Sequence, residues 1–96
     1  MPVFSVNVIA VYNGSPGSRA WETADQAEQW ARAEGLEELA IGEPGCSVDH
    51  SIVPVTFRMK LSCSSRDEVA GRVREWARQH PILIRAIGEV VDAAAT

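Results

Sequence analysis

Four side chains of this sequence could bind a metal ion or act as a nucleophile or base: Cys46, His50, Cys63 and His80. A structural zinc site needs two closely spaced ligand pairs, and only Cys46 and His50 are close in sequence. No nucleophile elbow or papain-like cysteine motif surrounds these residues. We therefore expect no metal, no cofactor and no catalytic residue, and a general base at His50 is the alternative.

The apolar runs of the sequence predict a cytoplasmic protein. That run, residues 3–12, has no basic segment before it and is interrupted by Ser5 and Asn7, unlike a secretory signal. No apolar run approaches the ~20 residues that span a bilayer. In a reducing compartment we expect Cys46 and Cys63 to be free, partly buried thiols rather than a disulfide.

The glycine-rich segment 13–19 lies between an expected strand and an expected helix, where backbone N–H groups can bind an anion. The Walker pattern needs Lys and then Ser or Thr after its last glycine, but Ser18 and Arg19 follow Gly17. The glycine–valine–arginine spacing of acylphosphatases is also absent. We interpret the segment as an ordinary loop, with an anion site as the alternative.

The net charge of −4 is unevenly distributed. Residues 1–48 hold seven acidic and two basic side chains, whereas residues 49–96 hold six acidic and seven basic ones. This balance disfavours direct binding to nucleic acid, which needs cations to displace phosphate counterions. The acidic half would instead suit a basic protein partner.

Residues 55–63 alternate apolar and polar side chains over nine positions, the pattern of a strand with one buried face. The apolar side chains would share the buried face: Val55, Phe57, Met59, Leu61 and Cys63. The polar side chains would share the opposite face: Thr56, Arg58, Lys60 and Ser62.

Further strands are expected on both sides of this one. Residues 3–12 have two largely apolar faces, which favours a position inside the sheet. Residues 82–91 form the last strand, with a kink or bulge at Gly88. Between residues 36 and 52, the strand is either residues 39–41 or residues 47–52.

Two helices are expected, over residues 23–34 and 66–79. Each begins at a capping box, formed by Thr23 with Gln26 in the first helix and by Ser65 with Glu68 in the second. Each helix has one apolar stripe: Ala24, Ala27, Trp30 and Ala31 in the first, and Val69, Val73, Trp76 and Ala77 in the second.

The order of these elements predicts a single domain over residues 1–96 of the α+β class. It is that of a ferredoxin-like βαββαβ unit, an antiparallel sheet with two helices packed on one face. Because each helix has only one apolar stripe, the other face of the sheet would stay open. Such a fold hosts many functions and assigns none of them.

The open face of the sheet is the first candidate partner-binding surface, and Thr56, Arg58 and Lys60 would lie on it. Sheets that bind RNA stack bases on outward aromatic side chains, which this strand lacks. We therefore expect a protein contact or a homodimer there. The second candidate is the acidic face of the first helix, with these residues: Glu22, Asp25, Glu28 and the neighbouring Trp21.

These features predict a small, acidic, non-catalytic binding or regulatory protein that acts through protein–protein contacts. One form of it is an inhibitor of a nucleic-acid-binding complex, similar in kind to a phage-encoded anti-CRISPR protein. The alternatives are a small enzyme of the dimeric α+β-barrel type, with His50, Asn7 and Arg58 in its pocket, and a ligand-sensing domain that uses the glycine-rich segment.

Overall fold

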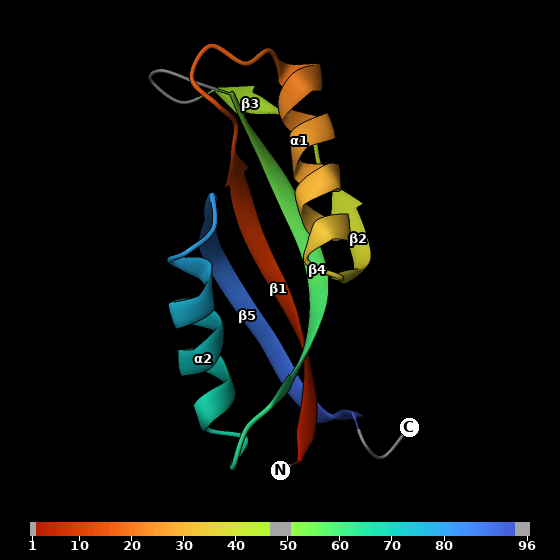
Figure 1. The fold of residues 1–96 in the computed structure, drawn as a ribbon, viewed down its shortest axis with the longest axis vertical. Coiled ribbons are helices and arrows are strands. Elements are labelled where there is room, and N and C mark those ends of the chain that lie inside the picture. Colours follow the sequence, from red (N-terminus) through yellow and green to blue (C-terminus); the bar gives the residue numbers. More distant parts are fainter. Residues whose placement is uncertain (1, 47–50, 94–96) are drawn as a thin grey trace.

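The structure, a computed structural model, describes residues 2–46 and 51–93. In chain order its elements are β1 (Val3–Asn13), α1 (Ala20–Ala33), β2 (Glu37–Ile41), β3 (Gly45–Cys46), β4 (Ser51–Ser62), α2 (Glu68–Ala77) and β5 (Ile82–Asp92). The molecule is elongated, with principal extents of 42, 21 and 19 Å, and its long strands run along its length (Figure 1).

The sheet is antiparallel, with the strands in the order β2, β4, β1 and β5, and the short β3 pairs with the start of β4. β1 lies between β4 and β5, which confirms the interior position predicted from its two apolar faces. Residues from both helices join one buried cluster on a single face of the sheet. The α+β class, the antiparallel sheet and the packing of two helices on it are thus confirmed.

β4 contains the alternating strand and extends it back to Ser51. Its buried face includes Val53 and Phe57, which are 0% and 1% exposed. Pro54 does not interrupt the strand, because its carbonyl oxygen accepts a hydrogen bond from the Gly42 N–H at 2.8 Å. Of the two strands considered between residues 36 and 52, the first is β2. Ser51 and Ile52, the described part of the second, belong to β4.

The ladder between β1 and β5 has a register shift at Asn7, which lies opposite both Gly88 and Glu89. A Cβ atom on Gly88 would lie 3.2 Å from the carbonyl oxygen of Asn7. A glycine therefore lets the two backbones approach at this point, and the predicted bulge at Gly88 is confirmed.

α1 begins at Ala20 rather than at the predicted Thr23. Its first turn is closed by Glu22, whose carboxylate accepts a hydrogen bond from the Arg19 N–H at 3.4 Å. Thr23 is fully buried inside the helix, and its hydroxyl donates to the Arg19 carbonyl oxygen. The predicted capping box was wrong because Gln26, its second member, hydrogen-bonds to the loop before the helix.

α2 is shorter at both ends than predicted. The carboxylate of Glu68 accepts hydrogen bonds from the N–H and the hydroxyl of Ser64, at 3.2 and 2.9 Å, so Ser64 and not Ser65 is the capping partner. At the other end, the N–H groups of residues 78–80 donate to carbonyl oxygens three residues earlier, a tighter turn that ends the helix.

An aromatic cluster fills the space between the two helices and the sheet. The Trp30 ring of α1 lies 5.7 Å from Phe57 of β4, 5.6 Å from Tyr12 of β1 and 5.9 Å from Trp76 of α2, between ring centroids. The indole N–H of Trp30 donates to Nδ1 of His80 at 3.1 Å. His80 therefore packs against the rings of Trp30 and Trp76, just after α2.

Cys63 is a free thiol, as expected, but it is fully rather than partly buried. The side chain of Cys46 and the whole of His50 lie outside what the structure describes. In the described parts of the chain, no helix is both long and apolar enough to cross a membrane.

We expect Gly14→Ala to lower the free energy of unfolding by about 1–2 kcal/mol. A Cβ atom there would collide with the Thr23 hydroxyl and lie 3.0 Å from the Ser51 carbonyl oxygen. The matched control is Gly71→Ala in α2, where a Cβ atom meets nothing within 4 Å. It should raise the free energy of unfolding by about 0.5–1 kcal/mol through helix propensity. Urea denaturation measures the free energy of unfolding of both variants. Equal changes in the two would contradict the close contacts described at Gly14.

We also expect the stability to fall at alkaline pH because of Tyr12, the one tyrosine of the chain. Burial raises the pKa of its phenol above the ordinary value of 10.0. The neutral phenol therefore stabilises the folded state fully below about pH 10, and this contribution is lost as the pH rises through the higher folded-state pKa. Urea denaturation of the wild type and of Tyr12→Phe should show a steeper alkaline loss in the wild type. Parallel pH profiles would refute this role of Tyr12.

Candidate functional site

The sheet face opposite the helices is covered by no described element and is the largest candidate contact surface. Alternate positions of the three long strands provide its side chains. They are Ser5, Asn7, Ile9 and Val11 of β1, Pro54, Thr56, Arg58 and Lys60 of β4, and Leu83, Ala86, Glu89 and Val91 of β5. Thr56, Arg58 and Lys60 lie together here, as their alternation in the sequence requires.

One half of this open face is apolar. In the register of the sheet, Ile9 lies beside Ala86, and Val11 lies between Pro54 and Leu83. Ile9 is 46% exposed and Leu83 is 63% exposed. Neighbouring exposed apolar side chains of this size mark contact surfaces in soluble proteins. Leu83 was not among the predicted site residues. Its position next to the buried Ile82 in a strand indicates an outward-facing side chain.

The other half of the open face is polar, and its charged side chains have partners within the chain. Arg58 Nε donates to Asn7 Oδ1 at 3.3 Å, and Lys60 Nζ lies 3.5 Å from Glu37 Oε1. Arg58, Asn7 and Glu89 line a shallow hollow of about 190 Å³. Arg58 and Lys60 therefore belong to a mixed patch, in which acidic and amide oxygens lie next to the two cations.

The acidic face of α1 is less available for a partner than its sequence suggests. Glu22 closes the first turn of the helix, and Glu28 forms an ion pair with Arg32 one turn later. Of the three carboxylates proposed for a basic partner, only Asp25 has no hydrogen bond or ion pair within the described chain. Trp21, in the first turn, is 66% exposed.

The glycine-rich loop before α1 uses its N–H groups for its own structure. The Gly14 N–H donates to the Ser51 carbonyl oxygen at 2.9 Å, and the Ser18 N–H donates to that of Ser15 at 3.0 Å. The Gln26 side chain accepts from the Ser15 N–H and donates to the Ser18 hydroxyl. These bonds fit the ordinary loop and leave few N–H groups for an anion.

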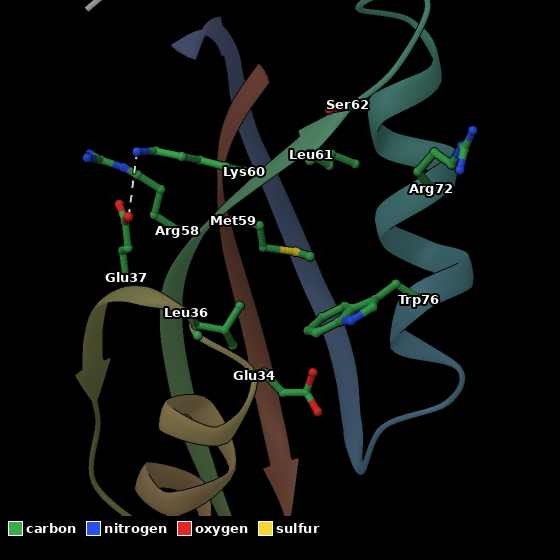
Figure 2. A pocket seen from close by; sticks show the side chains of 11 residues that line it. Glu34, Leu36, Glu37, Arg58, Met59, Lys60, Leu61, Ser62, Arg72 and Trp76 are labelled. Atoms are coloured by element: carbon green, nitrogen blue, oxygen red, sulfur yellow. Dashed lines mark ion pairs between the residues drawn. The ribbon is translucent and has the colours of Figure 1, made fainter. Parts of the chain in front are cut away.

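A cleft of about 550 Å³ opens on the helix side of the sheet, beside the end of β4 (Figure 2). Met59 and Leu61 of β4 lie at its base, and Leu36 and Trp76 lie on its two sides. The carboxylate of Glu34, just after α1, points into it. This cleft was not predicted. The alternating pattern assigns Met59 and Leu61 to the core face, but it does not show how much of that face the helices cover.

The residues considered for an enzyme pocket do not meet in this cleft. Asn7 lies on the open sheet face, and Figure 2 shows the Arg58 side chain directed away from the cleft, toward Glu37. His50, the third residue, lies outside the described residues. Within the ranges that the structure describes, no three His, Cys, Asp or Glu side chains gather as metal ligands would.

Comparison with known proteins assigns no family to the chain. No protein-family model matches it, and neither a curated protein nor a solved structure does. The proposed function therefore depends on the geometry of the surfaces described above.

We expect Glu22→Ala to lower the free energy of unfolding by about 0.5–1 kcal/mol, because it removes the partner of the Arg19 N–H. The matched control is Asp25→Ala, three residues later on the exposed side of α1, which should change stability by less than about 0.5 kcal/mol. Thermal and urea denaturation measure both variants. An equal loss in the two would mean that the acidic face stabilises the helix only through its total charge.

Proposed function

We propose that this protein is a small, acidic, non-catalytic regulator that binds protein through its open sheet face. The observation that supports the proposal most is the exposure of Ile9, Leu83 and Val91, at 46%, 63% and 46%, on a face that no described element covers. Because each is about half exposed, burial of one such side chain in an interface contributes roughly half of the ~1.5–3 kcal/mol for complete burial, or about 1 kcal/mol.

The first partner that we infer is a second copy of the chain, because the open face is complementary to itself. A twofold axis that runs over β1, parallel to the strands, places β4 of one copy over β5 of the other. This arrangement keeps the apolar half of one face over the apolar half of the other. It also brings Lys60 and Arg58 of β4 near Glu89 of the second copy, so opposite charges meet at the polar end.

The size of the face is adequate for such a contact. β1 has 11 residues, which makes the face about 36 Å long. Three strands ~4.8 Å apart, with half a spacing added beyond each outer strand, make it about 14 Å wide. The resulting area of roughly 500 Å², before the relief of the side chains is added, is of the order of the ~800 Å² that each partner buries in a standard interface.

We also propose that the fold is a variant of the ferredoxin-like fold. The order β2, β4, β1, β5 supports this assignment if β4 and β5 are counted as the third and fourth strands. Two features depart from it: the two-residue β3, and the positions of the helices near opposite ends of the long sheet (Figure 1).

A second candidate surface is the first turn of α1, where the exposed Trp21 lies near Asp25. A basic protein, such as one that belongs to a nucleic-acid-binding complex, could contact it, and the protein would then act as an inhibitor. We rank this surface below the open face, because Glu22 and Glu28 already have partners in the chain.

We expect Leu83→Asp to abolish self-association, because a carboxylate would have to be buried in the interface. Trp21→Asp is the matched control, since Trp21 is as exposed as Leu83 (66% and 63%) but lies on α1. Sedimentation equilibrium of the wild type and of Trp21→Asp should give twice the 10.4 kDa mass of one chain, and Leu83→Asp should give 10.4 kDa.

A charge exchange tests the inferred orientation of the two copies. Lys60→Glu and Glu89→Lys should each weaken self-association several-fold, and the double variant should restore it, because the two residues meet only between copies. A wild type that sediments as a single chain at about 100 µM would refute the self-association, since standard interfaces bind far more tightly.

A further inference from the structure

The end of β4 has a free backbone edge. β2 pairs with β4 only as far as Arg58, and in the described chain no strand pairs with the outer side of residues 59–62. The carbonyl oxygen of Pro54 points to the β2 side, because it accepts from the Gly42 N–H. Backbone groups of an antiparallel strand alternate sides, so the N–H and C=O groups of Lys60 and Ser62 face this free edge.

The cleft described above lies directly beside this edge, on the helix side. Its apolar surface comes from Leu36, Met59, Leu61 and Trp76. The basic residues of the same region leave its interior: Figure 2 shows Lys60 directed toward Glu37, and Arg72 directed to the outer side of α2. The charge that remains inside is the carboxylate of Glu34, whose side chain is 35% exposed.

The Glu34 carboxylate of the cleft lies next to His80. Its Oε1 lies 3.6 Å from Nδ1 of His80, and that nitrogen also accepts the indole N–H of Trp30 at 3.1 Å. No Lys or Arg side chain of the described chain forms an ion pair with Glu34. The same His80 ring lies against Trp76, with ring centroids 4.4 Å apart, which connects Glu34 to an aromatic wall.

A carboxylate, an aromatic face and an apolar base together favour a long alkyl chain that ends in a cation. The alkyl part of a Lys or Arg side chain packs on apolar surface, and its charged end binds both a carboxylate and an indole face. An extended peptide can supply this side chain and also pair its backbone with a free strand edge, a common mode of peptide recognition.

We propose that the cleft binds an extended peptide, which adds as a strand to β4 at Lys60 and Ser62 and places a Lys or Arg side chain between Glu34 and Trp76. The peptide side chains two residues before and after the basic one would point the same way, over Met59 and Leu61. This site is on the helix side of the sheet and does not depend on the open face, so Leu83→Asp should leave peptide binding unchanged.

The experiment selects peptides from a random ten-residue display library on the purified protein and measures the affinity of the enriched peptides by fluorescence anisotropy. We expect alternating β-branched sequences with a Lys or Arg at one fixed position. Glu34→Gln should weaken their binding about tenfold, whereas Glu37→Gln, at the rim, should change it less than about twofold.

A second pair of variants tests the backbone edge. Lys60→Pro removes the outward N–H and should also weaken binding about tenfold, because no hydrogen bond of the sheet uses that N–H and the strand can tolerate proline. Lys60→Ala, which keeps the N–H but loses the contact with Glu37, should bind like the wild type. Hydrogen exchange gives an independent test in the wild type: the Lys60 and Ser62 amides should exchange fast alone and become protected with peptide.

Several results would overturn the proposal. They are the failure of the library to enrich any peptide, binding that Glu34→Gln does not weaken, and equal affinity for free arginine and for the enriched peptides. Amides of Lys60 and Ser62 that stay unprotected in the peptide complex would also overturn it. None of these results bears on self-association through the open face, which is tested separately by the sedimentation mass of the Leu83→Asp variant.

Discussion

Trp30 joins the two helices of this protein to its sheet. Its ring contacts Phe57 and Trp76, and its N–H donates to His80, which follows α2. The residues that the helices bury are small, a threonine and two alanines in α1 and two valines and an alanine in α2. The large aromatic rings therefore fill the space between the two helices, and the position of each helix depends on this aromatic cluster.

The aromatic cluster also determines which parts of the sheet the helices leave uncovered. α1 packs over β4 and β2, and α2 packs over β5, so neither helix covers the end of β4 (Figure 1). The cleft follows from this gap, and the free backbone edge follows from the end of the β2 pairing at Arg58. The open face follows from the packing of both helices on the opposite side. The chain thus presents two apolar surfaces to water, one on each side of its sheet, which suits a protein that works by binding.

The sequence contains enough information for the three long strands, because their signals are local, but it left the short β2 undecided between two segments. The alternation over residues 55–63, the two apolar faces of β1 and the bulge at Gly88 each depend on side chains within one segment. The start of α1 was predicted wrongly, since Glu22 and Gln26 both offered capping partners and the choice depends on the loop that Gln26 binds. Contacts between distant segments were not predictable in this way.

The candidate site shows the same limit. Alternation placed Arg58 and Lys60 on the open face, but their partners Asn7 and Glu37 come from two other strands and require the register of the sheet. The cleft could not be predicted, because Leu36 and Trp76 meet across it only through the positions of the helices. Periodicity identifies the face of a residue, whereas the distance between two such faces depends on tertiary packing.

An isotope-filtered NOE experiment on an equal mixture of ¹³C-labelled and unlabelled protein tests the contact between open faces most directly. The expected result is a set of cross-peaks between copies that involve the methyl groups of Ile9 and Leu83. Methyl groups of Val69 and Val73, which lie on the buried face of α2, should give none. The absence of cross-peaks between copies from Ile9 and Leu83, in a sample whose mass is that of a dimer, would contradict the account.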